Sequence, residues 1–378
     1  MLSPGVVEIS AGRIVALRRA RGAVPDRVLL PGLVNAHVHL QLPPLRQAPR
    51  DFVPWLRAVI AARAGIPARE LVATAASGLA QLLGDGVTAV GEIDSSGLSP
   101  QALRQVPLAG RCYQEVLGFA LGPAAARTLV RQRMQAGTRH CPAGLSPHAP
   151  YSVSPALLRR VQATGLPLAV HLAEDRAELA LLAAGTGPLA TLLRELGKLP
   201  ADFVPPRLTP TAWLARAGAL GGRTQLVHAQ HLAPREAEQI AAAGAAIVVC
   251  PGTIEHFRRA PPPVPAWLQL GIPVGLGTDS LASNTGLSLR REMARARGLW
   301  PELSPEQVLA MATRHGGRAL ARPGLGRLRV GGRADLLALT LEPGEGLGAA
   351  LDRFTAGADR TVSVWLRGRA VEAHGGQS

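Results

Sequence analysis

The segment PGLVNAHVHL, residues 31–40, joins an apolar run to two histidines placed two positions apart. An apolar run of this kind is typical of a strand that is buried on both faces. On a strand, residues i and i+2 point to the same side, so His37 and His39 can offer ring nitrogens to one ion. The pair alone is a weak signal, because two polar residues on a turn have the same spacing. The apolar run that leads into the pair strengthens the metal-site interpretation.

Seven further apolar runs follow along the chain, with helical patterns between them. We interpret the eight strands as residues 28–34, 87–91, 111–117, 144–147, 167–171, 224–228, 245–250 and 273–277. The alanine-rich and leucine-rich stretches 68–83, 155–163 and 234–243 favour helix. Eight β/α units over this length predict an α/β fold, a closed (β/α)8 TIM-like barrel more than an open sheet.

The two ends of the chain have a different pattern, of short strands and Gly-rich turns. We expect residues 1–27 and 325–378 to pair into one small β-sandwich domain beside a hydrolase barrel of residues 28–324. The proline-containing stretch 185–210 interrupts the spacing between the fifth and sixth strands, so it is interpreted as an inserted loop and a candidate lid.

Polar side chains stand where these apolar strands end, and all strand ends of such a barrel meet on one face. They are His37, His39, Glu92, Glu115, His148, His171, His228 and Asp279. In most proteins His171 would be a hydrogen-bonded core histidine, but here it can be a third ligand. An aspartate at a buried strand end needs a cation or several donors to offset its desolvation, so Asp279 is the fourth candidate.

Three histidines and an aspartate suit one divalent ion, Zn2+ or Fe2+, with an open position for water. Such an ion brings the pKa of its water towards about 7, which predicts a metal-dependent hydrolase. Glu174 follows His171 by three residues and can shuttle a proton in the same cavity. His228 can orient the water or stabilise developing charge, whereas His231 and Cys250 are interpreted as structural.

The formal charge of +15 taken alone would favour nucleic acid or a membrane surface. Nearly all of the positive charge is scattered arginine, and aromatics are only 3% of the chain, so little is available to stack bases. We therefore predict neither nucleic-acid nor membrane partners. The composition fits a GC-rich genome or, alternatively, a basic mouth for an anionic small substrate.

The three cysteines are far apart and form no C-x-x-C pair, which fits a reducing cytosol without a disulfide framework. The first ten residues lack the features of a signal peptide, and the longest apolar run is too short to span a bilayer. We expect a cytoplasmic, soluble protein.

Five stretches together resemble the amidohydrolase superfamily, in its branch of aminohydrolases that act on purines, pyrimidines and triazines. They are PGLVNAHVHL (31–40), LSPHAPYSVS (145–154), VHLAE (170–174), LVHAQHL (226–232) and GLGTDSLASN (275–284). The resemblance implies metal ligation by His37, His39, His171 and Asp279, proton shuttling by Glu174, and a His228 that faces the attacking water. It also implies that Asp279 takes a proton from that water. Binuclear members carry a lysine after the fourth strand, but the only lysine here is Lys198, so one metal is favoured.

Within this branch, YQEVLG around Glu115 and the CPxxxxHF pattern of residues 250–257 are most similar to aminodeoxyfutalosine deaminases of menaquinone biosynthesis. Such an enzyme attacks C6 of an adenine-containing nucleoside and releases ammonia. Candidate substrate contacts are His148, Glu115, Ser280 and Arg290, and the carboxylate of that substrate would need Arg258, Arg259 or Arg290. The chain has Gly-Thr-Ile at 252–254 where relatives usually have Arg-Ser-Asn, and Leu-Gln at 40–41 where many have an acidic residue.

Other interpretations stay open from the sequence. They include a methylthioadenosine, adenosylhomocysteine or guanine-type deaminase; a hydrolase of an amide, carbamate or chloride; and a non-catalytic scaffold relative. The small substrate is a nucleoside or heterocyclic amine in the favoured case, and a homodimer is an expected assembly. A nucleic-acid deaminase is excluded, because its His-x-Glu and Pro-Cys-x-x-Cys motif is absent.

Overall fold

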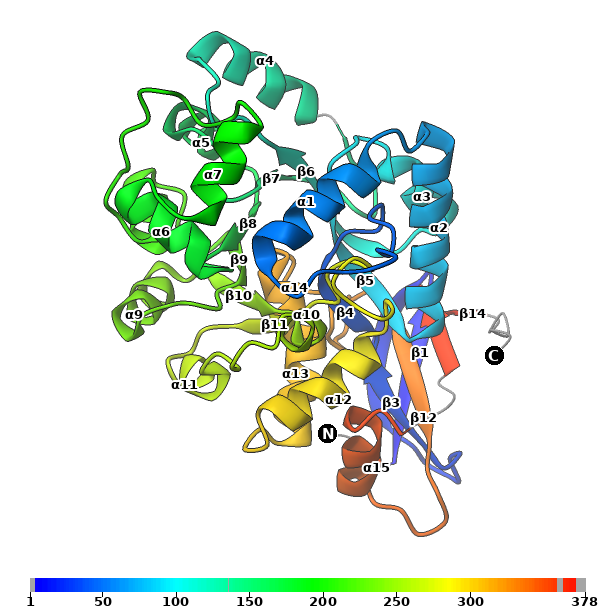
Figure 1. The fold of residues 1–378 in the computed structure, drawn as a ribbon. Coiled ribbons are helices and arrows are strands. Elements are labelled where there is room, and N and C mark those ends of the chain that lie inside the picture. Colours follow the sequence, from blue (N-terminus) through cyan, green and yellow to red (C-terminus); the bar gives the residue numbers. More distant parts are fainter. Residues whose placement is uncertain (1–3, 135, 359–362, 372–378) are drawn as a thin grey trace.

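The computed structural model describes residues 4–134, 136–358 and 363–371, and its central element is an eight-stranded barrel (Figure 1). The strands follow one another in chain order: β4 (Leu33–Val38), β5 (Val87–Asp94), β6 (Ala109–Val116), β7 (Ala143–Pro147), β8 (Leu168–Leu172), β9 (Thr224–His228), β10 (Ala246–Val249) and β11 (Val274–Leu276). Val38 and Asp279 form a parallel bridge that joins the first strand to the end of the last. The predicted (β/α)8 barrel is confirmed.

Helices connect the strands along the chain. They are α1 (Phe52–Arg63), α2 (Ala68–Gly84), α3 (Ser99–Gln105), α4 (Pro123–Arg133), α5 (Pro155–Gln162), α6 (Arg176–Ala184), α7 (Pro188–Glu195), α8 (Pro210–Arg216), α9 (Pro234–Ala243), α10 (Pro251–His256), α11 (Val264–Gln269), α12 (Leu289–Leu299), α13 (Pro305–Ala310), the π-helical turn η1 (Met311–His315), α14 (Gly316–Ala319) and α15 (Leu347–Thr355). Several begin with a hydroxyl cap followed by proline. Ser154, Thr209 and Ser304 each accept a backbone N–H of the first turn, and the proline after each presets the helical φ.

The apolar strand predicted at 28–34 is in fact two strands. Residues Arg27–Pro31 form β3, which pairs antiparallel with β12 (Leu336–Thr340) outside the barrel. Only β4 enters the barrel. Gly32 lies between them, and a Cβ at this position would stand 2.2 Å from Oγ1 of Thr88. Glycine is therefore needed where the chain crosses from one sheet to the other.

Both ends of the chain build the small domain beside the barrel, as predicted (Figure 1). The hairpin of β1 (Gly5–Ser10) and β2 (Arg13–Arg19) lies near a four-stranded antiparallel sheet in the order β14-β13-β12-β3. The two C-terminal strands of that sheet are β13 (Ser363–Leu366) and β14 (Arg369–Val371). Ile14 is fully buried against Ala334 and Leu336. The boundaries at residues 27/28 and 324/325 stay predictions.

The stretch 185–210 is not only a loop, because it contains helix α7. Leu189 and Leu193 of this helix are buried against Phe52 and Trp55 near the start of α1. The ion pair between Arg57 and Glu195 also joins the two helices. A short buried face thus fixes α7 over the barrel, beside α1 (Figure 1). Among the described residues, no helix has the length and apolar character needed to cross a bilayer.

Candidate active site

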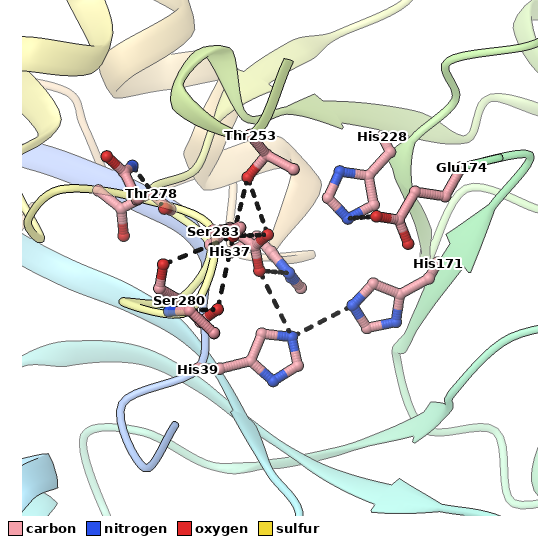
Figure 2. A network of polar contacts seen from close by, with 12 residues as sticks. His37, His39, His171, Glu174, His228, Thr253, Thr278, Ser280 and Ser283 are labelled. Carbon is pink, nitrogen blue, oxygen red and sulfur yellow. Dashed lines mark hydrogen bonds and ion pairs between the residues drawn. The ribbon is translucent and has the colours of Figure 1, made fainter. Parts of the chain in front are cut away.

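Four predicted ligands meet at the carboxyl ends of the barrel strands. His37 lies in β4, His39 follows it, His171 lies in β8, and Asp279 follows β11. Nε2 of His39 is 3.2 Å from Nε2 of His171 (Figure 2). Oδ1 of Asp279 is 3.5 Å from Nε2 of His37 and 3.8 Å from Nε2 of His39. Ligand atoms of His37 also group within 4.8 Å of those of His171 and His228.

The chemistry of this group fits a divalent ion. His37 is fully buried, yet neither of its ring nitrogens has a hydrogen-bond partner among the described residues. Nδ1 of His171 lies 3.0 Å from the carbonyl oxygen of His148, which directs Nε2 towards the cluster. Burial lowers the pKa of His39 and of His171 well below the usual value, so their rings are neutral and can donate lone pairs.

Two hydroxyl groups hold the Asp279 carboxylate in place. Oγ1 of Thr253 and Oγ of Ser283 donate to its Oδ2, at 2.8 and 2.7 Å (Figure 2). Its Oδ1 is thereby turned towards the histidines. Burial by itself would raise the pKa of Asp279, but the side chain of His37, whose Nε2 lies 3.5 Å from Oδ1, and the neighbouring imidazoles of His228 and His39 hold that pKa well below its usual range. Asp279 is thus a carboxylate.

Neither of these hydroxyl residues was expected at the site from the sequence. Ser283 lies in GTDSLASN, and Thr253 lies in the Gly-Thr-Ile segment that departs from the usual pattern of relatives. The available signal was a hydroxyl residue in the segment after a strand end, because Thr253 lies four residues after β10 and Ser283 lies seven residues after β11. The Gly-Thr-Ile departure therefore places a supporting donor beside Asp279.

Glu174 and His228 form a second pair in the same site. Oε1 of Glu174 is 3.8 Å from Nε2 of His228 (Figure 2). Burial raises the pKa of Glu174 to about 8 against the opposing charge of Arg259, and burial lowers the pKa of His228 to about 3. Glu174 can therefore exchange a proton near neutral pH, while His228 stays neutral.

The backbone at the strand ends is strained. His228 and Asp279 have φ of 69° and 56°, and Ala173, which precedes Glu174, has φ of 49°. Non-glycine residues adopt such angles rarely, at a cost of about 1–3 kcal/mol each, and they cluster at functional sites.

The predicted substrate residues divide into two groups. Glu115 and His148 line the cavity above the histidines, with Oε1 of Glu115 4.0 Å from Nε2 of His148. Ser280 is buried, and its Oγ accepts the backbone N–H of Ala282 at 3.3 Å. Nε of Arg290 donates to Oδ1 of Asp85 at 2.9 Å. Neither Ser280 nor Arg290 lines the cavity.

Glu92 lies two residues before the end of β5 and has a structural role. Its two carboxyl oxygens accept the backbone N–H of Leu40, at 3.1 Å, and the hydroxyl of Ser99, at 2.7 Å. Glu92 therefore fixes the loop that follows His39.

The cavity has a volume of about 710 Å³ and two chemically different parts. Its base holds the histidines and carboxylates described above. Its outer wall is apolar, and comes from one face of α1 and from the region of α7. The wall residues are Trp55, Leu56, Val59, Ile60, Leu192, Leu193 and Leu196, with Arg63 and Lys198 also lining the cavity.

A barrel with a buried histidine and aspartate cluster at its strand ends defines a metal-dependent hydrolase. Comparison with known proteins specifies the class further: a profile of the amidohydrolase family matches residues 28–371, and the chain belongs to that family. It is a hydrolase of carbon–nitrogen bonds that holds a divalent metal. The fourth barrel strand, β7, ends at Pro147 and is followed by His148 instead of a lysine, which agrees with the mononuclear aminohydrolase branch.

Two curated relatives are deaminases. The chain is 33% identical over 315 residues to the aminodeoxyfutalosine deaminase of Deinococcus radiodurans, covering 78% of this chain and 73% of that one. It is 30% identical over 375 residues to the 5-methylthioadenosine/S-adenosylhomocysteine deaminase of Nitratidesulfovibrio vulgaris, covering 90% and 80%.

Solved structures share the fold over nearly the whole chain. An adenosine deaminase from Xanthomonas campestris with bound zinc has a TM-score of 0.78 at 25% identity, covering 97% of this chain and 88% of that one. The Helicobacter pylori aminofutalosine deaminase has a TM-score of 0.81 at 21% identity, covering 96% and 93%, which speaks for the fold alone.

Proposed function

We propose that the protein is a hydrolytic deaminase of an adenine-containing nucleoside, and that the nucleoside is aminodeoxyfutalosine. The observation that carries the proposal is the Glu174–His228 pair, set 3.8 Å apart beside the histidine and aspartate cluster. The similarity to the Deinococcus radiodurans deaminase supports the substrate. On this proposal the enzyme serves menaquinone biosynthesis; its cytoplasmic location and a homodimer stay predictions.

The residues of the site divide the reaction between them. His37, His39, His171 and Asp279 would hold the ion. When bound, zinc or iron supplies Lewis-acid activation of water. Asp279 takes a proton from the attacking water as the oxygen adds to C6 of the purine. Glu174 donates its proton to the adjacent ring nitrogen, and His228 stabilises charge at the attacked centre.

The second half of the reaction breaks the bond from C6 to the amino group. Glu174 takes the proton of the new hydroxyl group and passes it to the amine, which departs as ammonia and leaves a carbonyl at C6. The proton held by Asp279 then returns to Glu174, so both carboxyl groups regain their starting states. Glu115 and His148 line the cavity beside this centre and are the proposed contacts of the purine ring.

The outer cavity supports a substrate with an apolar middle and an anionic end. Arg63 follows the apolar face of α1, and its Nε is buried without a hydrogen-bond partner among the described residues. Lys198, the only lysine of the chain, lines the same cavity. These two cations, rather than Arg258 or Arg290, are the proposed contacts of the substrate carboxylate. Arg258 does not line the cavity, and Arg290 pairs with Asp85.

A second candidate is a methylthioadenosine or adenosylhomocysteine deaminase. The apolar wall of Leu56, Val59 and Ile60 favours it, because a thioether would bury well there. The similarity to the Nitratidesulfovibrio vulgaris enzyme is also consistent with it.

The test is ammonia release from aminodeoxyfutalosine, methylthioadenosine, adenosylhomocysteine, adenosine and guanine, with metal content assayed on the same sample. We expect a preference for aminodeoxyfutalosine at one metal per chain. A preference for a thioether nucleoside would replace it with the second candidate. No ammonia from any of them, with metal present, would refute the deaminase and move the search to amide, carbamate or chloride substrates. No turnover on those either would favour a scaffold.

Two variants test the anionic end separately. Arg63→Met and Lys198→Met should each raise KM for aminodeoxyfutalosine about tenfold or more, because a charge-assisted contact contributes about 1.5–3 kcal/mol. The same variants should leave KM for methylthioadenosine nearly unchanged, because that substrate carries no carboxylate. Equal effects on both substrates would remove these cations from carboxylate recognition.

A further inference from the structure

Arg259 is buried directly behind the Glu174 side chain. It lies just after α10, and its side chain is only 10% exposed. Its Nη2 donates to Oδ2 of Asp175 at 3.0 Å, and its Nη1 is 3.8 Å from Oε1 of Glu174. The guanidinium carbon lies 4.2 Å from the centre of the Phe257 ring. Arg259 does not line the substrate cavity.

The backbone of the Glu174 loop is held by other groups. Oε2 of Glu178 accepts the N–H of Glu174 at 3.1 Å, and Oδ1 of Asp175 accepts the N–H of Ala177 at 2.9 Å, which caps α6. These contacts fix the main chain and involve no atom of the Glu174 carboxylate. Within the described part of the chain, the ion-pair partners of that carboxylate are His228 and Arg259.

We propose that Arg259 is a positioning residue, which acts through Glu174 by holding its carboxylate beside His228. This inference rests on the proposed function, because it assigns Glu174 the proton transfers. Arg259 reaches the carboxylates of Glu174 and Asp175 with two different nitrogens while its flat face stacks on Phe257. A lysine offers one charged nitrogen and no flat face, so it cannot make both contacts in that geometry.

The placement also rules out another role for this arginine. From the sequence, Arg259 was a candidate partner of the substrate carboxylate. Its guanidinium is committed to two acidic side chains and an aromatic ring and is nearly closed to solvent. A substrate would have to displace Asp175 to reach it.

The first test compares Arg259→Met and Arg259→Lys with Arg258→Met, which removes the same charge from the neighbouring exposed arginine. We expect Arg259→Met to lower kcat about 100-fold, the cost of a misplaced catalytic group, with KM within about twofold and metal content unchanged. Arg259→Lys should recover only part of the loss, and Arg258→Met should behave as wild type. A loss that appears in KM or metal content, or equal losses in Arg258→Met, would overturn the proposal.

The second test asks whether Arg259 acts only through Glu174. In a Glu174→Gln background, Arg259→Met should cause no further loss of kcat, because the group that it positions no longer transfers protons. A loss that multiplies with that of Glu174→Gln would show an independent role and refute the positioning.

A crystal structure of Arg259→Met supplies a readout that needs no turnover. The Glu174 carboxylate should leave its place beside Nε2 of His228, while its backbone hydrogen bond to Glu178 remains. A Glu174 side chain that stays in place would overturn the inference. Failure of the wild-type protein to release ammonia would instead refute the proposed function, and this crystallographic test would still decide the role of Arg259.

Discussion

Thr253→Val should weaken metal binding although Thr253 is not itself a proposed ligand. Its hydroxyl donates to Oδ2 of Asp279 at 2.8 Å and lies 3.2 Å from the hydroxyl of Ser283. Valine keeps the shape of threonine and removes only this donor. The carboxylate then keeps the Ser283 hydrogen bond, at 2.7 Å, as its remaining hydroxyl contact among the described residues.

The expected magnitude follows from the burial of this contact. Asp279 is 4% exposed and Thr253 is 1% exposed, so water does not easily replace the lost donor. A hydrogen bond to a charged group contributes about 1.5–3 kcal/mol. Loss of one partner that orients a ligand typically costs about 10- to 100-fold in metal affinity. Because Ser283 still donates, we expect about tenfold for Thr253→Val and up to about 100-fold when Ser283→Ala is added.

The assay is titration of the metal-free protein with Zn2+ against a competing chromophoric chelator. Thr211→Val in α8 is the matched control, because Thr211 is also fully buried but its hydroxyl has no hydrogen-bond partner among the described residues. The control should bind Zn2+ as wild type does. Wild-type affinity in Thr253→Val, or an equal loss in Thr211→Val, would refute the view that Thr253 supports the ligand Asp279.

Four further predictions test the site and the barrel. Asp279→Asn should abolish turnover with an unchanged circular dichroism spectrum, and retained activity would remove Asp279 from the site. Glu174→Gln should keep the metal and lower kcat by about 100- to 10,000-fold, whereas parallel loss of metal would make Glu174 a ligand. Adding Zn2+ at about 1,000 times its Kd to the metal-free protein should stabilise the fold by about 4 kcal/mol in urea unfolding; an unchanged midpoint would contradict a native metal site. Gly110→Ala should destabilise by about 3 kcal/mol or more, because Gly110 has φ of 130° and the new Cβ would stand 1.9 Å from the carbonyl oxygen of Val90; an unchanged unfolding midpoint would contradict this.

The barrel could be predicted because a strand that is buried on both faces appears in the sequence as a short, continuous apolar run. The predicted strand at 224–228 matches β9, and the others of the barrel end within a few residues of the observed bounds. The prediction of one strand at 28–34 was wrong, because an apolar run does not show that its two halves belong to different sheets. Gly32 lies where the chain crosses between the sheets. Glycine is needed there because of Thr88, which is more than fifty residues away in the chain.

The helix in the stretch 185–210 was missed for a different reason. The prolines there favoured a loop, yet Leu189, Leu192 and Leu193 have the spacing of a helical face that packs inward. Proline at the first position of a helix, as at Pro188, begins a helix instead of breaking one.

The site could be predicted as far as its residues end strands, and no further. A polar group at the end of a buried apolar run needs a partner, and this pattern identifies His37, His171 and Asp279 in the sequence. Thr253 and Arg259 give no such signal, because each reaches its partner across space from the segment after β10. Residues of this kind decide where a carboxylate points, and only the folded chain shows which carboxylate that is.

Arg290 is a residue that the sequence placed at the site and the structure does not. Arg290 was expected at the substrate, and the fold instead gives it to Asp85, a carboxylate at the end of α2. With 41 basic residues scattered along the chain, proximity in sequence to a catalytic motif says little about which guanidinium faces the cavity. Position in the cavity is more informative: Arg63 lines the cavity with a buried Nε that has no partner among the described residues, and the exposed Lys198 lines the same cavity. Burying a guanidinium nitrogen without a hydrogen-bond partner is costly, so the Nε of Arg63 favours a ligand that supplies an acceptor there. For this reason the outer cavity is better evidence for an anionic substrate than the net charge of the chain.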